Sequence, residues 1–78
     1  MQLTIKYFGP LTDITGCREE RFEFEKGKTV SELLIALHGK YPELAEQKFK
    51  VAHNRELAEG NTRVTSTEIG LLPPFAGG

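Results

Sequence analysis

The sequence predicts an α+β fold in which a mixed sheet of four to five strands is covered on one face by one main helix. Two observations lead to this prediction. Apolar residues alternate over residues 2–8 and again over 20–25, and over 30–41 their spacing changes to that of a helix. Such a helix has one apolar stripe and such strands have one apolar face, so packing the stripe against the faces buries both.

Two alternating runs predict the first two strands. In residues 2–8, Leu3, Ile5 and Tyr7 fall on one face, as they do in a half-buried strand. In residues 20–25, Phe22 and Phe24 share a face. The stretch between them, 9–16, is rich in turn-forming residues, so we predict a loop there and a hairpin made by the two strands.

The main helix is predicted over residues 30–41, where apolar residues recur at i, i+3, i+4, i+7 and i+11. Thr29 is placed to cap its start, and Glu32 completes a capping-box pattern. Gly39 and Pro42 predict where it ends. The residues of the stripe are Val30, Leu33, Leu34, Leu37 and Tyr41.

Shorter strands are predicted in the second half of the chain. One covers residues 48–52, and Asn54-Arg55 offers a turn into a short strand at 56–57. Residues 63–65 fit an edge piece, and 68–72 fit a last strand that ends at Pro73, which cannot continue a central ladder. This order of elements is that of a β-grasp fold. We predict one domain over residues 1–78, with 73–78 as an extended functional tail.

Composition excludes several classes of function. The chain has 78 residues, a net charge of −1 and no basic run, so we expect no binding to nucleic acid. It shows no signal peptide and no membrane span, and its single cysteine, Cys17, cannot form an internal disulfide. We therefore expect a cytoplasmic protein. His38 and His53 lack the spacing of metal ligands, so no metal site is expected.

The tail is the strongest candidate for chemistry. The sequence ends on Gly77-Gly78 behind Pro73-Pro74, and chance would give two terminal glycines in only about 0.5% of proteins. A C-terminal carboxylate has a pKa of about 3.3–3.7, so it is ionised and must be activated before it can react. Glycines leave that carbon accessible, and the prolines favour an extended exit. We expect Gly78 to be the reactive residue and Gly77 to give it access.

A docking patch is predicted beside the tail. Phe8 falls on the polar face of the first strand, and together with Phe75 it would form an apolar surface for a partner. An exposed aromatic without a function stays open as the alternative. The predicted partner-binding residues are Phe8, Pro73, Pro74, Phe75 and Ala76.

Three stretches of the sequence together suggest a family. They are 6–11 (KYFGPL) with Thr15-Gly16, the helix start 29–34 (TVSELL), and the ending 71–78 (LLPPFAGG). In these stretches the chain resembles the MoaD family, the small subunits of molybdopterin synthase. Together with ThiS, that family belongs to the ubiquitin-like sulfur carriers. The specificity of the resemblance lies mainly in the ending.

The resemblance implies a substrate-like subunit rather than an enzyme acting alone. An E1-like (MoeB-like) enzyme would adenylate Gly78 with ATP and Mg, and the terminus would become a thiocarboxylate. The tail would then enter a MoaE-like large subunit, within a heterotetramer, and give its sulfur to a cyclic pyranopterin precursor. The chain itself would bind no cofactor.

Two other functions stay open. One is a sulfur carrier for thiamine, tungsten-cofactor or tRNA-thiolation pathways. The other is a ubiquitin-like protein modifier, joined through Gly78 to lysines of other proteins.

The sequence also departs from the MoaD pattern in three places. It has Thr12-Asp13 for Arg-Glu, Asn54-Arg55 for Asn-Gly and Ser66-Thr67-Glu68 for Gly-Asp-Glu. Arg55 suits the positive φ of a type I′ turn poorly. We therefore expect altered local turns or a different large subunit.

Overall fold

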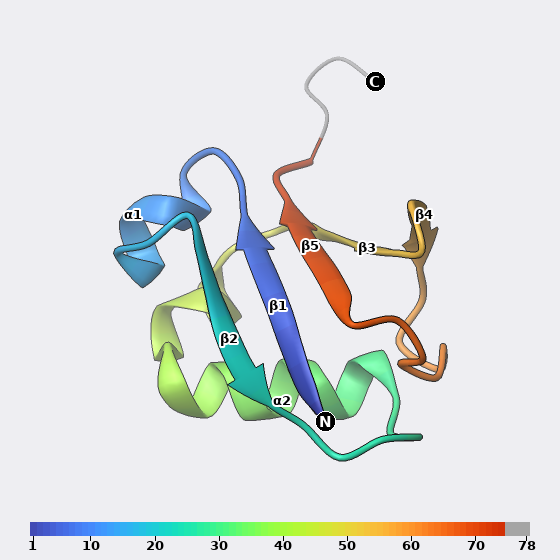
Figure 1. The fold of residues 1–78 in the computed structure, drawn as a ribbon. Coiled ribbons are helices and arrows are strands. Elements are labelled where there is room, and N and C mark those ends of the chain that lie inside the picture. Colours follow the sequence, from blue (N-terminus) through green and yellow to red (C-terminus); the bar gives the residue numbers. More distant parts are fainter. Residues whose placement is uncertain (75–78) are drawn as a thin grey trace.

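The computed structural model describes residues 1–74 and places them in one sheet with helices on one of its faces (Figure 1). In chain order the elements are β1 (Gln2–Tyr7), α1 (Leu11–Thr15), β2 (Glu19–Glu23), α2 (Val30–Lys40), the 3-10 helix η1 (Pro42–Glu46), β3 (Lys50–His53), β4 (Glu56–Ala58) and β5 (Glu68–Leu72). The predicted mixed sheet with one main helix is confirmed.

The sheet has five strands in the order β2-β1-β5-β3-β4. β1 pairs in parallel with β5, whereas β1–β2, β3–β5 and β3–β4 are antiparallel. Parallel strands end at the same edge of a sheet, and Tyr7 near the end of β1 is paired with Leu71 near the end of β5. The loop after β1 and the segment after β5 therefore start at the same edge of the sheet, where the loop turns back into α1 and the segment after β5 leads away (Figure 1).

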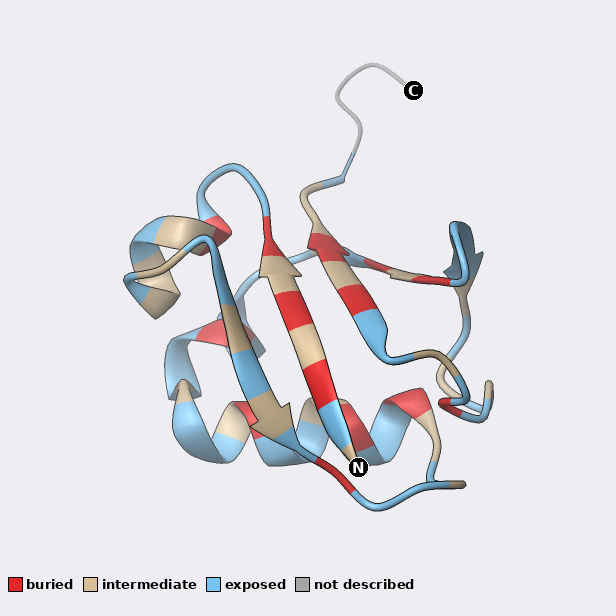
Figure 2. Ribbon diagram, in the orientation of Figure 1, coloured by how far each residue is buried: buried red, intermediate tan, exposed pale blue. Residues whose placement is uncertain are grey.

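The core lies between the sheet and α2. Figure 2 shows buried residues alternating with partly buried or exposed ones along β1 and β5, as expected for strands with one buried face. The predicted inner face of β1 is fully confirmed, because Leu3, Ile5 and Tyr7 are all buried. Three residues of the predicted stripe of α2 are buried against that face: Val30, Leu33 and Leu37.

The predicted cap of α2 is also confirmed. The Glu32 N–H donates to Thr29 Oγ1 (3.3 Å), and the Thr29 N–H donates back to Glu32 Oε1 (3.1 Å). This backbone hydrogen bond lowers the pKa of Glu32 below its usual value. At the other end, α2 runs through Gly39 to Lys40, and Pro42 then begins η1, a position that needs no backbone N–H.

Two short helices were not predicted. α1 lies in the stretch 9–16 that we expected to be a loop, and η1 follows the main helix. Each is held to the core by a single buried leucine, Leu11 in α1 and Leu44 in η1. Each helix has only five residues, which is too few to show a helical period, so the sequence pattern gives no sign of either helix.

The edge strand predicted at 63–65 is present only as one isolated β-bridge. Arg63 pairs with Thr29 outside the named strands, and Val64 beside it is buried in the core. The imidazole of His53 holds the segment that follows, because its Nε2 accepts hydrogen bonds from the N–H groups of Thr65 (3.0 Å) and Ser66 (3.1 Å). The histidine is thus a structural acceptor.

The turn between β3 and β4 is not altered by the departure at Asn54-Arg55. Both residues have positive φ, 54° and 64°, as a type I′ turn requires. The expectation that Arg55 would change this turn is therefore wrong. Arginine takes the left-handed conformation there, which costs roughly 1–2 kcal/mol because its Cβ approaches the following carbonyl oxygen.

Replacing Arg55 by glycine should therefore stabilise the domain. Glycine has no Cβ, so Arg55→Gly removes this strain, and the greater freedom of glycine in the unfolded chain offsets part of the gain. We expect the free energy of unfolding to rise by up to about 1 kcal/mol in urea titrations. As a control, Lys26→Gly changes an exposed turn residue that lacks positive φ, and should lower stability. An Arg55→Gly variant no more stable than wild type would contradict the strain.

Candidate functional site

The tail leaves the domain against the loop that follows β1. The Phe8 N–H donates to the Leu71 carbonyl (3.1 Å), which extends the contact between the two strands by one residue. Gly9 has φ +59°, and a Cβ placed on it would lie 3.1 Å from Pro73 Cγ. Glycine is thus favoured both by the backbone angle and by the close approach of Pro73. Of the predicted partner-binding residues, the structure brings Phe8 and Pro73 to one place.

Phe8 lies on the sheet face opposite α2. Its side chain is 44% exposed, and a Cβ placed on Gly70 would be 3.5 Å from Phe8 Cε2. Gly70 sits between the buried Ile69 and Leu71 on β5 and so faces outward. The absence of a side chain at Gly70 gives the Phe8 ring room to lie close to the strand.

The exposed ring continues into a row of apolar positions across the outer face. Gly70 is paired with Ala52 on β3, and Ala52 is paired with Leu57 on β4. Leu57 is 58% exposed. We call Phe8, Gly70, Ala52 and Leu57 the outer apolar row. It starts beside the tail exit and ends at the edge strand.

Sequence reasoning found Phe8 but missed the rest of this row. A glycine inside a strand pattern is a known sign that another group approaches the backbone, so Gly70 could have been singled out. Leu57 and Ala52 could not, because their place beside Gly70 depends on the register of three strands.

A shallow groove of about 530 Å³ adjoins Phe8 on its other side. Phe8, Gly9 and Thr12 line it, together with charged side chains of both signs on β1 and at the start of β2. Thr12, one of the departures from the MoaD pattern, donates through Oγ1 to the Gly9 carbonyl (2.8 Å). The threonine thus stabilises the loop that carries Gly9.

A polar cluster holds the end of β1 from the inner side. The Tyr7 hydroxyl donates to Glu20 Oε1 (2.7 Å), and the Tyr41 hydroxyl reaches Glu20 Oε2 at 2.8 Å. Lys40 Nζ lies 3.0 Å from the same Oε2. The two tyrosine rings meet edge to face with centroids 6.2 Å apart. The cluster joins β1, β2 and the end of α2.

The protonation states of this cluster follow from its contacts. Burial raises the pKa of Glu20, but hydrogen bonds from Tyr7, Tyr41 and Lys40 outweigh burial and hold it below its usual value. Burial, and the hydrogen bond to Glu20, raise the pKa values of both tyrosines. At neutral pH the cluster therefore contains one carboxylate and two protonated phenols. Because these groups bind one another, we interpret the cluster as structural.

The remaining predicted residues are placed as follows. Pro73 is half-buried and Pro74 is exposed where the tail leaves the domain. Phe75, Ala76, Gly77 and Gly78 lie outside the described residues, so their roles stay predictions.

Within residues 1–74, no three His, Cys, Asp or Glu side chains are grouped as a metal site would need. In the same part of the chain, no helix combines the length and apolar character that crossing a membrane demands.

Comparison with known proteins decides the family. The ThiS family matches residues 5–78. The chain belongs to the ThiS family. The predicted membership of the MoaD/ThiS group of ubiquitin-like sulfur carriers is thereby confirmed.

Two relatives match over almost their whole length. The chain is 31% identical over 83 residues to the molybdopterin synthase sulfur carrier subunit of Caenorhabditis briggsae, covering 100% of this chain and 99% of that one. It is also 31% identical over 84 residues to small archaeal modifier protein 1 of Haloferax volcanii, covering 94% and 97%.

The fold has a close counterpart among solved structures. The crystal structure of small archaeal modifier protein 1 from Haloferax volcanii matches with a TM-score of 0.81 at 27% identity, and the match covers 100% of both chains. The predicted ubiquitin-like β-grasp fold is therefore confirmed. The relatives carry the names of two different functions, a sulfur carrier and a modifier.

Glu20 should make the stability of this domain depend on pH. Its folded pKa lies below that of the unfolded chain, so its contribution is present above the ordinary glutamate pKa of about 4.3 and is lost as pH falls below it. Relative to wild type, we expect Glu20→Gln to lower the free energy of unfolding at pH 7 by about 1.5–3 kcal/mol, the range for hydrogen bonds to a charged group. The deficit should shrink towards pH 3.

Urea titrations between pH 3 and pH 7 would measure this difference. Glu19→Gln is the matched control, since Glu19 is exposed on the same strand and its replacement should change stability little at any pH. A deficit in Glu20→Gln that stays constant over this range would show that the charge of Glu20 does not matter.

Proposed function

We propose that this protein is a sulfur carrier that serves as the small subunit of a molybdopterin synthase and acts through the carboxylate of Gly78. Family membership supports the carrier role, and the full-length match to the Caenorhabditis briggsae subunit supports the pathway. The observation that carries the proposal is the parallel pairing of β1 with β5. It brings the exit of the tail beside an exposed phenylalanine and an apolar row.

The proposed chemistry begins with activation of the terminus. An E1-like, MoeB-like enzyme uses ATP and Mg to join the Gly78 carboxylate to AMP, releasing pyrophosphate. A donor of sulfur at the oxidation level of sulfide then displaces AMP, which leaves a C-terminal thiocarboxylate. AMP is a good leaving group, whereas the oxygen of the free carboxylate is not. The chain itself binds no cofactor in this scheme.

Sulfur transfer takes place inside the partner. Residues 73–78 can span roughly 18–20 Å when extended, so Gly77 and Gly78 can enter a MoaE-like large subunit while the domain stays on its surface. The thiocarboxylate sulfur is then transferred to a cyclic pyranopterin precursor. In this assembly, a heterotetramer, the outer apolar row is the docking surface, with Phe75 and Ala76 extending it along the tail. We place the carrier in the cytoplasm, where ATP is available.

A second candidate function is protein modification. The match to small archaeal modifier protein 1 favours it, in sequence and in fold. Activation would be the same, but a lysine amine rather than sulfur would displace AMP and form an isopeptide bond with Gly78. Thiamine, tungsten-cofactor or tRNA-thiolation pathways would share the thiocarboxylate and differ in the protein that receives the tail.

Intact-mass analysis of the protein isolated from cells tests the carrier role. We expect a fraction whose mass has risen by the replacement of one carboxylate oxygen by sulfur. A persistent carboxylate in the presence of the activating enzyme and ATP would overturn the proposal. Gly78 found on lysines of other proteins would instead establish the modifier.

Deleting Gly78 should abolish sulfur transfer and leave the fold intact. The new terminus would stop about 3.3 Å short of the original one, and the described domain ends before the change. Pterin sulfuration and the free energy of unfolding are the two measurements. Lys26→Gln, a change on the β2–α2 loop far from the tail exit (Figure 1), is the control that should preserve both. Normal sulfuration without Gly78 would refute the mechanism.

The outer apolar row should matter for binding and little for stability. Leu57→Glu places a charge at its end, and we expect the affinity for the large subunit to fall about tenfold or more, equal to roughly 1.4 kcal/mol. Ile35→Glu is the matched control, because Ile35 is also a large exposed apolar residue, 71% accessible, but lies on α2. Calorimetric titration would measure both. Equal affinities of the two variants would exclude the row as the docking surface.

A further inference from the structure

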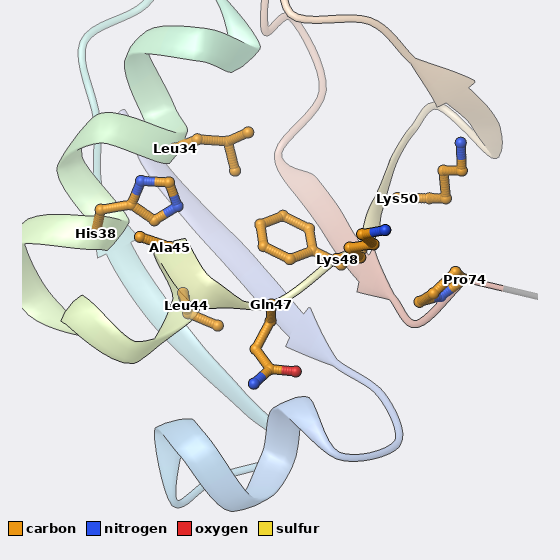
Figure 3. Close-up of a pocket in the computed structure, with 9 residues that line it drawn as sticks. Leu34, His38, Leu44, Ala45, Gln47, Lys48, Lys50 and Pro74 are labelled. Carbon is orange, nitrogen blue, oxygen red and sulfur yellow. The ribbon is translucent and has the colours of Figure 1, made fainter.

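A second groove opens at the tail exit, between α2, η1 and β3 (Figure 3). Its volume is about 430 Å³, and Pro74 lies at one end of it. It shares no residue with the outer apolar row. Figure 3 shows its side chains coming from the helical layer on one side and from the segment leading into β3 on the other.

The floor of this groove is apolar. Leu44 is fully buried, while Leu34 and Phe49 are half-buried and pack against the core from its edge. Half-covered apolar side chains in a concave surface favour a site that another apolar group fills.

The rim of the groove is positively charged. Lys48 and Lys50 are exposed there, and neither has an ion pair with any residue of 1–74. No carboxylate occurs among the described residues that line the groove. In contrast, three other lysines each meet a glutamate: Lys6, Lys28 and Lys40. This is therefore a local cationic feature on a chain whose net charge is −1.

His38 contributes to the wall of the groove a polar atom without a hydrogen-bond partner among residues 1–74. Its Nε2 is buried and has no hydrogen-bond partner in the described part of the chain, and His38 lines the groove from α2 (Figure 3). A buried polar atom without a partner destabilises the fold. His53, by comparison, has two backbone donors at its Nε2. Nε2 can gain a partner from outside only when the His38 side chain turns into the groove.

We propose that this groove docks an acidic protein segment that carries an apolar side chain. The apolar side chain would cover Leu34 and Phe49, and carboxylates would meet Lys48 and Lys50. Charges of opposite sign on the two surfaces give the contact its specificity and speed up the encounter.

The segment belongs to a protein that takes the tail, and for this identity the inference rests on the proposed function. The groove begins at Pro74, the last described residue of the exit. A protein that holds the four residues after Pro74 must lie close to the groove, because four residues span at most about 14 Å. The groove and the outer apolar row then form two separate contacts beside one tail.

A pair of synthetic peptides tests the groove directly. Both peptides carry the same leucine and phenylalanine residues, and glutamates in one replace lysines in the other. In heteronuclear NMR titrations of the full chain, we expect the acidic peptide to shift the signals of His38 and residues 44–50. The basic peptide should leave them in place. Equal shifts with both peptides, or no shifts there with the acidic one, would overturn the proposal.

Charge reversal supplies the second measurement. The double variant Lys48→Glu/Lys50→Glu should weaken acidic-peptide binding at least tenfold, and the wild-type affinity should fall with added salt. Arg21→Glu/Lys26→Glu is the matched control, since it changes the net charge equally at exposed positions on β2 and the following loop. Equal losses in the two double variants would show that only net charge matters and would contradict a specific groove.

The groove proposal and the proposed function can fail independently of each other. Thiocarboxylate at Gly78 reports on the carrier role, and the peptide titration needs no thiocarboxylate. If the protein that receives the tail binds wild type and the Lys48→Glu/Lys50→Glu variant equally, the groove proposal fails while the carrier role stands.

Discussion

The parallel ladder between β1 and β5 is the interaction on which the rest of the structure depends. Ile5 is paired with Ile69 and Tyr7 with Leu71, and all four side chains are buried in the core. A slip of one residue would turn Ile69 and Leu71 to solvent, so the core fixes the register of the last strand. Because the pairing is parallel, that register also fixes where the tail leaves. Packing in the interior therefore determines the geometry of the exit.

Three consecutive residues, the last of β1 and the two that follow it, connect the packed core to the surface beside the tail exit. Tyr7 is held on the inner side by the carboxylate of Glu20, and Phe8 lies over Gly70 on the outer side. Gly9 then turns the chain against Pro73. Polar contacts inside and apolar contacts outside thus position the same short segment. The outer apolar row can stay exposed because the strand beneath it is held from the core.

Regular periodicity made most of the fold predictable. Alternation on β1 and the capped stripe on α2 are local signals, and Phe8 stood out because it broke one of them. α1 and η1 were missed since each has only five residues, too few to show a helical period. Leu57 was missed because only the register across β5, β3 and β4 brings it into line with Gly70. Arg55 was misjudged because the hairpin imposes a backbone conformation that arginine disfavours. Thus local patterns predicted the elements, whereas contacts between distant strands determined the candidate docking surface.

In the proposed function, the two terminal glycines alone cannot select a partner. Glycine has no side chain to recognise, and adenylation proceeds in the same way whether sulfur or an amine later displaces AMP. A difference in affinity between partners must therefore arise from surfaces that each partner meets differently. The structure offers two such surfaces at the exit, the outer apolar row and the groove rimmed by Lys48 and Lys50. One is uncharged and the other cationic, so a protein complementary to both is distinguished from one that matches either alone. On this view the glycines supply the chemistry, and the domain beside them determines which protein receives it.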